Sequence, residues 1–236
     1  MKDKYHFFDG LSQSRQSGVI PVIAEIKVYT PNNGDLLRDR TVESIAELYQ
    51  RSGMACISVV TGHWFKGTPD LLQRVSEVTE LPILRKDFIV TRSALERTKE
   101  LGASAVLLTK QLVDDATLKK LVDYALTLGL TPFIEVGSLK DIVEIRVDQE
   151  AILAVCNRDI KTRETDGGDI TKSLDLLACA KSTGAGLVVS ASAIENSDQA
   201  KQLLEAGYDG LLIGTAFLRA PDLTAVLSEF YKALKN

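Results

Sequence analysis

Short apolar runs separated by amphipathic stretches recur along this chain. In five places a helix-like segment ends in a glycine and an apolar run follows it. Gly53, Gly102, Gly129, Gly184 and Gly207 stand where a left-handed helix terminator belongs. With three further apolar runs, the pattern predicts eight strands, centred on residues 21–27, 55–61, 82–86, 104–109, 131–136, 151–156, 186–190 and 210–214.

Amphipathic segments between these runs predict helices. "TVESIAELYQR" begins after Thr41 without a full capping box, and Ser197 is the expected cap of "SDQAKQLLEAG". Continuous apolar strands that alternate with helices indicate a parallel sheet covered by helices. Eight such units predict a single (β/α)8 TIM barrel domain over residues 1–236, of the α/β class. A doubly wound open sheet is the alternative, but the first turn, "KVYTPNNGD", is no dinucleotide-binding fingerprint.

The overall composition narrows the class of partner. With 45% hydrophobic residues and a net charge of −4, the chain is typical of a soluble globular protein and gives no reason to expect nucleic acid or an acidic membrane as a partner. Cys56, Cys156 and Cys179 lack paired spacing, and the polar start lacks a signal core, so we expect the cytoplasm. His6 and His63 lie too far apart in the sequence to suggest a histidine metal site.

Charged residues cluster at the predicted strand ends, where such barrels carry their chemistry. Glu25 and Lys27 alternate on the first strand and therefore share a face, Lys86 ends the third strand, and Glu135 lies in the fifth. Two lysines at one end of a barrel repel unless an anion lies between them, which predicts an anionic ligand. A structural ion pair is an equally good interpretation of Glu25, whereas the position of Glu135 favours a proton acceptor.

Small residues follow the seventh and eighth strands. "SASAIENS" and "IGTAFLRAPD" let backbone N–H groups approach a ligand closely, and each precedes a helix start, where negative charge is favoured. The corresponding loops bind phosphate in many barrels of this kind. Either segment alone is explained as well by tight turns. Together, above two lysines, they predict a phosphate site.

Six segments resemble indole-3-glycerol phosphate synthases in order and spacing, from about Val19 to Pro221. The resemblance implies a (β/α)8 barrel without cofactor or metal. It implies a carbon–carbon lyase (a carboxy-lyase) of tryptophan or indole-derived metabolite biosynthesis, which closes a phosphorylated carboxyphenylamino-deoxyribulose to an indole with loss of carbon dioxide and water. The segments are "PVIAEIKVYTPNNGDL", "WFKGTPDLL", "LPILRKDFIV", "GASAVLL", "NRDIKT" and "DGLLIGTAFLR".

The same resemblance implies four catalytic roles. Lys86 would be the general acid at the substrate ketone, and Lys27 would pair with the substrate carboxylate as a candidate second proton donor. Glu135 would act as base or acid in the dehydration. Glu25 would orient the lysines and stabilise positive charge on the ring intermediate. These roles make physical sense, since ring closure onto a carbonyl needs an acid near the developing alkoxide.

The resemblance also implies a substrate-binding set. Phe65 and Phe88 would pack the aromatic ring, and Arg158 would order the loop after the sixth strand, next to Asn157 and Cys156. The phosphate would rest on Thr30, Ser192, Ala193, Gly214 and Thr215.

The chain departs from the family pattern at several positions. Cys156 stands where the family has a substrate-facing Asn, and Asn157 fills the next position. Ala191 replaces a carboxylate beside the active-site lysine, which should leave the lysines harder to protonate. Ala193 replaces Gly and is expected to crowd the phosphate site. We interpret Cys156 as a small buried hydrophobe rather than a nucleophile, and expect a short or missing N-terminal cover.

The sequence therefore favours a divergent synthase acting on a small phosphorylated aromatic substrate, as a monomer or homodimer. Two alternatives stay open. One is a related lyase or cyclase on a different phosphorylated substrate, and the other is a non-catalytic homologue that binds a phosphorylated metabolite. Retention of both lysines and both glutamates disfavours the second alternative, because phosphate binding alone needs neither Glu25 nor Glu135.

Overall fold

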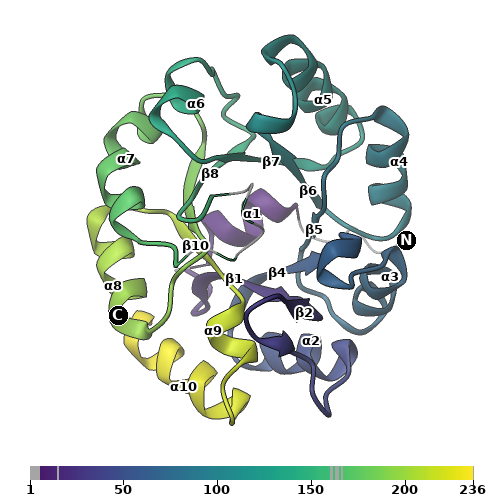
Figure 1. Ribbon diagram of the computed structural model, residues 1–236, viewed down its shortest axis with the longest axis vertical. Helices are drawn as coiled ribbons and strands as arrows, with labels where there is room; N and C mark the ends of the chain where they lie inside the picture. Colours follow the sequence, from purple (N-terminus) through teal and green to yellow (C-terminus); the bar gives the residue numbers. More distant parts are fainter. Residues whose placement is uncertain (1–5, 15, 160–161, 163–164, 166, 236) are drawn as a thin grey trace.

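A closed ring of eight parallel strands lies at the centre of the computed structural model, which describes residues 6–235 except 15, 160–161, 163–164 and 166. Each strand lies within one residue, at either end, of a predicted one, and the ring closes where β10 pairs with β1 (Figure 1). The predicted barrel is confirmed and the open sheet is wrong. In ring order the strands are β1 (Ile20–Ile26), β4 (Met54–Val60), β5 (Ile83–Lys86), β6 (Ala105–Thr109), β7 (Thr131–Val136), β8 (Ile152–Cys156), β9 (Leu187–Ala191) and β10 (Gly210–Ile213).

Helices surround this ring and separate the strands along the chain (Figure 1). The five predicted glycine terminators all have positive φ, from 68° to 120°, a conformation that costs other residues more. These terminators are confirmed. The outer helices are α2 (Val42–Arg51), α3 (Pro69–Val78), α4 (Arg92–Glu100), α5 (Asp115–Thr127), α6 (Leu139–Val143), α7 (Thr171–Lys181), α8 (Ser197–Ala206), α9 (Thr215–Leu218) and α10 (Leu223–Leu234).

Two predicted helix starts need correction. Thr41 does form a full capping box, because the Ser44 hydroxyl accepts from the Thr41 backbone N–H at 3.2 Å while the Ser44 N–H donates to Thr41 Oγ1 at 3.1 Å. The cap of α8 is Asn196, whose side chain accepts from the Gln199 N–H at 2.9 Å, and Ser197 is the first helical residue. In both helices a short polar side chain accepts a hydrogen bond from a backbone N–H at the helix start, where no carbonyl of the helix is available as a partner.

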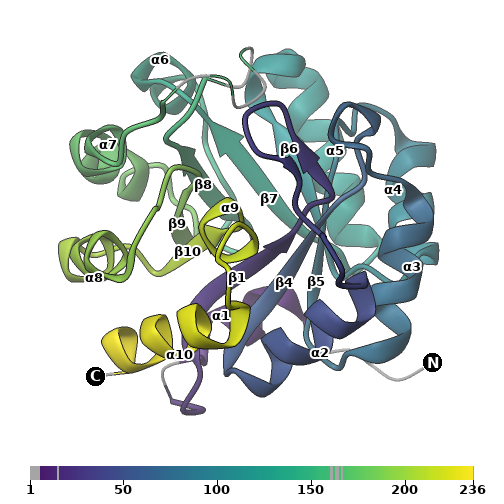
Figure 2. The same cartoon turned by 60° about the horizontal axis from the view of Figure 1, so that its bottom comes forward.

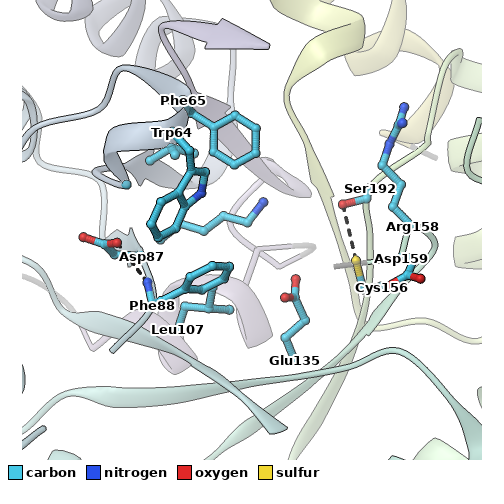
Figure 3. Close-up of a pocket in the computed structure, with 13 residues that line it drawn as sticks. Trp64, Phe65, Asp87, Phe88, Leu107, Glu135, Cys156, Arg158, Asp159 and Ser192 are labelled. Carbon is cyan, nitrogen blue, oxygen red and sulfur yellow. Dashed lines mark hydrogen bonds between the residues drawn. The ribbon is translucent and has the colours of Figure 1, made fainter. Parts of the chain in front are cut away.

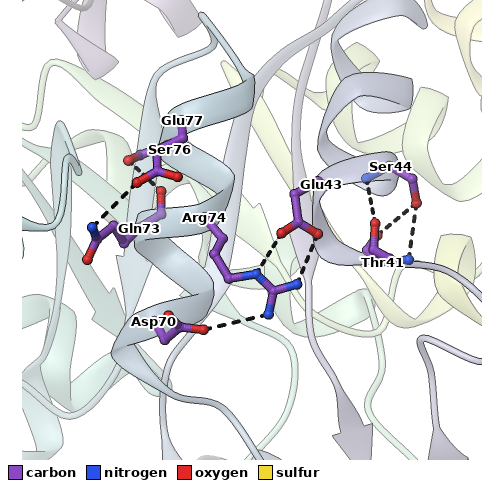
Figure 4. A network of polar contacts seen from close by, with 8 residues as sticks. All are labelled: Thr41, Glu43, Ser44, Asp70, Gln73, Arg74, Ser76 and Glu77. Atoms are coloured by element: carbon purple, nitrogen blue, oxygen red, sulfur yellow. Dashed lines mark hydrogen bonds and ion pairs between the residues drawn. The ribbon is translucent and has the colours of Figure 1, made fainter.

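A bidentate ion pair ties α2 to its neighbour α3 on the outside of the barrel (Figure 4). Arg74 of α3 donates from Nε and Nη2 to the two carboxylate oxygens of Glu43 at 2.6 and 3.1 Å, and it also approaches Asp70 at 3.6 Å. The hydrogen bonds from Arg74 hold the pKa of Glu43 at about 2. The helices α2 and α3, which follow β1 and β4 along the chain, are therefore fixed relative to each other.

The short helix α1 (Phe7–Ser12) lies across the centre of the ring at one end of the strands (Figures 1 and 2). Phe7 and Leu11 are fully buried, and the Phe7 ring meets Phe133 edge to face with centroids 6.4 Å apart. Gly210, the first residue of β10, admits Leu11, because a Cβ there would lie 2.9 Å from it. The described part of the N-terminal segment thus closes the end where the strands begin.

Two short elements follow β1 and β4 at the opposite end. β2 (Tyr29–Thr30) and β3 (Gly34–Asp35) form an antiparallel hairpin, and η1 (His63–Phe65) is a single 3₁₀ turn. A second such turn, η2 (Lys110–Leu112), follows β6. Residues 1–5 of the predicted N-terminal segment, and Ile160 and Lys161 of "NRDIKT", lie outside the described residues. Across the described residues, no helix combines the length and the apolar character needed to span a bilayer.

Candidate active site

A buried carboxylate bridges two lysines at the mouth of the barrel. Glu25 points inward from β1, where its Oε1 lies 2.9 Å from Lys27 Nζ and its Oε2 lies 2.8 Å from Lys86 Nζ. Glu25 and Lys27 are each only 2% exposed, and Lys86 is 14% exposed. The predicted convergence of these three side chains is confirmed. The anion between the lysines is Glu25 itself, however, so their proximity alone does not require a bound anion.

The surroundings of Glu25 keep it ionised. Burial acts to raise the pKa of this carboxyl, but the charges and hydrogen bonds of Lys27 and Lys86 outweigh burial and lower the pKa to about 2. The Tyr49 hydroxyl donates to the Glu25 backbone carbonyl at 3.1 Å. Gly214 leaves room for the carboxylate, because a Cβ there would lie 2.7 Å from Glu25 Oε1. The glycine of the motif "IGTA" is therefore explained by its packing against Glu25.

Glu135 enters the same mouth from β7. It is 4% exposed, pairs in register with Thr109 of β6 and Ala154 of β8, and directs its carboxylate into a cavity (Figure 3). Lys86 lines that cavity as well. Glu135, a candidate acid or base, and Lys86, a candidate proton donor, therefore line the same cavity.

This first cavity, the ring cavity, has an aromatic wall. Phe65 and Phe88 both line it, as predicted, and Lys27 Nζ lies 5.5 Å from the centroid of the Phe65 ring. Trp64 also lines it, with its ring centroid 4.5 Å from that of Phe88 (Figure 3). Our sequence analysis missed Trp64, although it stands next to Phe65 in "WFKGTPDLL". The lining residues are Val60, Gly62, Trp64, Phe65, Lys86, Asp87, Phe88, Leu107, Glu135, Cys156, Arg158, Asp159 and Ser192.

A second cavity adjoins the first and shares Arg158 and Ser192 with it. We call it the small-residue cavity. The predicted residues Ser192, Ala193, Gly214 and Thr215 all line it, and Lys27 and Arg158 bring positive charge to it. Its lining residues are Glu25, Lys27, Arg158, Ser192, Ala193, Ile194, Glu195, Leu212, Ile213, Gly214, Thr215 and Ala216.

Thr30 lines neither cavity. It belongs to the β2–β3 hairpin, where its hydroxyl accepts hydrogen bonds from the Asn33 backbone N–H at 3.2 Å and from Asn33 Nδ2 at 2.9 Å. The side chain is 1% exposed. The structure therefore gives the Thr30 hydroxyl a turn-forming role, and its expected contact with a phosphate stays a prediction.

Asn157 is likewise turned away from both cavities. Its Nδ2 donates to Ser190 Oγ at 3.1 Å and to the Ser192 carbonyl at 2.9 Å, while its Oδ1 accepts from the Ser173 N–H at 3.1 Å. These bonds join the ends of β8 and β9 to α7. Asn157 thus holds the loop after β9 through these hydrogen bonds, and it lines neither the ring cavity nor the small-residue cavity.

Cys156 lines the ring cavity between Glu135 and Ser192. Its Sγ lies 3.7 Å from Ser192 Oγ, and burial, followed by the charge of Glu135, raises the pKa of the thiol to about 12. A thiol that stays protonated is a poor nucleophile, which supports our interpretation of a small buried side chain. Ala191, a second departure from the family pattern, ends β9, is fully buried and lines neither cavity.

The backbone of the β9 loop is strained at two consecutive non-glycine residues. Ser192 has φ 69° and Ala193 has φ 55°, both in the left-handed region that favours glycine. Glycine at position 168 lets the neighbouring loop pass Ala193, because a Cβ on Gly168 would lie 2.5 Å from the Ala193 Cβ. The expected crowding of the phosphate site by Ala193 stays a prediction.

An acidic residue at the rim of the small-residue cavity is paired with two arginines. Glu195 Oε2 lies 2.5 Å from Arg219 Nη2, and Glu195 Oε1 lies 3.9 Å from Arg158 Nη2. This pairing offsets a negative charge beside a predicted phosphate site. Neither Glu195 nor Arg219 was singled out from the sequence, because their pairing depends on how the β9 and β10 loops meet.

The described residues contain no group of three or more His, Cys, Asp or Glu side chains that could hold a metal ion. His6 lies near the start of β7, where its Nδ1 is 3.1 Å from Thr131 Oγ1. His63 packs against Trp64, with ring centroids 4.4 Å apart, at the other end of the barrel. The two histidines therefore cannot contribute to one site.

Comparison with known proteins places the whole chain in one family. A family model described as "Indole-3-glycerol phosphate synthase" matches residues 1–230. An indole-3-glycerol phosphate synthase of Pyrococcus furiosus is 38% identical over 226 residues, which cover 95% of this chain and 97% of that relative. One from Carboxydothermus hydrogenoformans is 38% identical over 213 residues, covering 90% and 79%.

Two solved structures of similar fold are far more distant in sequence. A 3-hexulose-6-phosphate synthase from Salmonella typhimurium has a TM-score of 0.67 at 14% identity, over 90% of this chain and 97% of that one. A tryptophan synthase alpha-subunit mutant from Pyrococcus furiosus has a TM-score of 0.64 at 13% identity, over 92% and 97%. At such identity these likenesses support the barrel fold alone.

The strain at Ala193 leads to a stability prediction. Ala193→Gly should raise the free energy of unfolding by about 0.5–1 kcal/mol, because glycine accepts a left-handed φ at little cost even after its larger loss of chain entropy. Urea unfolding measures the change. The control Ala116→Gly, on the exposed face of α5, should lower stability by about 0.5–1 kcal/mol. A loss at position 193 equal to that of the control would show that no strain is stored there.

The Glu25 bridge leads to a pH prediction. Because the pKa of Glu25 is lower in the folded chain than in the unfolded one, its contribution to stability is present above about pH 4.5 and is lost as pH falls toward about 2. The difference in unfolding free energy between wild type and Glu25→Gln should therefore shrink across this range. Urea titrations at several pH values test it, and a difference independent of pH would contradict the assigned ion pairs.

Proposed function

Because the chain belongs to the indole-3-glycerol phosphate synthase family, we propose that it closes a phosphorylated carboxyphenylamino-deoxyribulose to an indole, with loss of carbon dioxide and water. The observation that carries this proposal is the pair of adjoining cavities. The ring cavity has an aromatic wall, the small-residue cavity is lined by Lys27, Arg158 and the small residues that follow β9 and β10, and Arg158 and Ser192 are common to both. A substrate with an aromatic ring at one end and a phosphate at the other fits this arrangement.

The acid–base residues lie where the middle of such a substrate would pass. Lys86 and Glu135 line the ring cavity, Lys27 lines the small-residue cavity, and Glu25 holds both lysines. With the ring against Phe65 and Phe88, the substrate carboxylate would lie near Lys27, whose Nζ is 5.5 Å from the Phe65 ring centroid. The phosphate would meet the backbone around Ser192 and Gly214.

In the first step, the ring carbon that bears the carboxylate attacks the ketone carbon. Lys86 gives a proton to the ketone oxygen as the new carbon–carbon bond forms. The bond to the carboxylate then breaks, carbon dioxide leaves, and its electron pair restores the ring. Glu25, ionised between the lysines, keeps Lys86 directed at the cavity and offsets positive charge on the ring intermediate.

In the second step, the new hydroxyl leaves as water. Glu135 accepts the proton released as the indole double bond forms. Lys27, which still holds its proton after Lys86 has given its own to the ketone oxygen, gives the proton that the leaving hydroxyl needs. The burial of Glu135 limits competition from solvent for that proton. A cytoplasmic location and the choice between monomer and homodimer stay predictions.

A related cyclase with a different ring substrate is the second candidate. Among the departures from the family pattern, Cys156 is the one that lines the ring cavity, and its side chain is shorter than the expected Asn. That change alters the surface that the ring end of a substrate meets. The acid–base residues are the same in both candidates, so only the choice of substrate separates them.

Replacing Lys86 tests the proposed acid. Lys86→Ala should lower kcat by about 100- to 10,000-fold while leaving the protein folded, because it removes the proton donor from the ring cavity. Indole fluorescence during conversion of the phosphorylated carboxyphenylamino-deoxyribulose gives the rate. Lys140→Ala, exposed on α6, is the matched control and should be unaffected. Saturable substrate binding without turnover by the wild type would favour the second candidate.

Restoring the two family residues tests whether the departures slow the reaction. Cys156→Asn together with Ala191→Glu should raise kcat/KM above that of the wild type, because they return an amide to the ring cavity and a carboxylate near the lysines. Each single variant should be measured as well, since Ala191 is fully buried and glutamate there must displace neighbours. If the folded double variant is no faster, the departures do not limit this reaction.

A further inference from the structure

Trp64 forms part of the wall of the ring cavity and packs against a glycine of its own loop. It is the only tryptophan of the chain, it is half-buried, and it reaches the cavity from the loop after β4. Its indole lies against Gly62, where an added Cβ would be 3.1 Å from Cε2 and 3.2 Å from Cζ2. Gly62 has φ −66° and ψ 131°, which any residue adopts. The glycine is therefore needed for the approach of the indole, not for its own backbone conformation.

The loop that carries Trp64 is held in a fixed shape. The Gly62 carbonyl accepts from the backbone N–H groups of Phe65 and Gly67, each at 3.1 Å. Gly67 packs so tightly that a Cβ would lie 2.4 Å from the Val60 carbonyl oxygen. The side chain of Trp64 is consequently presented by a turn with little freedom to move.

A polar contact behind the cavity ties this loop to the one that carries Phe88. The Thr61 hydroxyl donates to Asp87 Oδ2 at 2.7 Å, and Asp87 Oδ1 accepts from the Phe88 N–H at 2.9 Å. Arg85 also donates to Asp87 Oδ2, at 3.1 Å. The Trp64 and Phe88 rings, which are tilted by 33° at a centroid distance of 4.5 Å, are thus set relative to each other from both loops (Figure 3).

From this arrangement we infer that Trp64, packed against Gly62, is a specificity-determining residue for the substrate. Its indole contacts the aromatic ring of the substrate and selects a planar ring over an aliphatic group. The inference rests on the proposed function and adds a residue to it. A large rigid indole gives much contact area at small entropic cost, and aromatic rings prefer such offset and tilted neighbours. In contrast, the aromatic residues Trp64, Phe65 and Phe88 do not line the small-residue cavity.

The kinetic test separates ring recognition from chemistry. Trp64→Ala should raise KM for the phosphorylated carboxyphenylamino-deoxyribulose by about 10-fold with a much smaller change in kcat, and Trp64→Phe should recover most of the loss. Tyr124→Ala removes an aromatic ring from α5, outside both cavities, and should leave KM unchanged. Unfolding curves of all variants check that each is folded. A KM unaffected by Trp64→Ala overturns the inference.

A double-mutant cycle tests the role of Gly62. Gly62→Ala should raise KM when Trp64 is present, because the added methyl pushes the indole by a few tenths of an ångström, and should have little effect in the Trp64→Ala background. Additive effects of the two changes would show that Gly62 acts through something other than the indole.

Binding of the separate ligand halves distinguishes failure of this inference from failure of the proposed function. Calorimetric titration with 2-aminobenzoate should show weaker binding to Trp64→Ala than to the wild type, whereas titration with inorganic phosphate should show equal binding. Equal binding of 2-aminobenzoate by both proteins overturns the role of Trp64 alone. A wild type that binds neither probe and does not turn over the substrate overturns the proposed function and, with it, this inference.

Discussion

The double ion pair of Glu25 is the interaction on which the site depends. Two lysines held at the mouth of a barrel repel each other and lose hydration, and a buried charge without a partner costs several kcal/mol. Glu25 reaches Lys27 and Lys86 with separate oxygens, at 2.9 and 2.8 Å. Lys86 reaches Glu25 from β5, two strands away through β4. Closure of the barrel brings Gly214, which follows β10, against Glu25 of β1, and a side chain at position 214 would collide with the carboxylate.

The same interaction bears on the alanine at position 191. From the sequence we expected that losing a carboxylate there would leave the lysines harder to protonate, and this stays a prediction. One carboxylate nevertheless contacts both lysines, and its own pKa of about 2 shows how strongly their charges favour its ionised form. Glu25 thus gives Lys86 a buried anionic partner 2.8 Å away although position 191 carries no carboxylate.

The barrel could be predicted from the sequence because its signals are local: apolar runs give the strands, and the terminating glycines give the helix ends. The inward direction of Glu25 and Lys27 follows from the two-residue strand period. The roles of Thr30 and Asn157 could not be predicted in this way, because their partners depend on a hairpin turn and on α7, and no spacing encodes these contacts. Trp64 was missed because an aromatic residue in a loop has no periodicity to mark it.

The departures from the family pattern are distributed unevenly over the site. Glu25, Lys27, Lys86 and Glu135 carry the proposed acid–base roles, while Cys156 lines the ring cavity and Ala193 strains the loop of the small-residue cavity. The same barrel fold occurs in proteins only 13–14% identical with other names, so the fold alone does not specify the substrate. On the proposed function, the departures therefore bear on the two ends of a ligand, while the residues proposed to transfer protons lie between those ends.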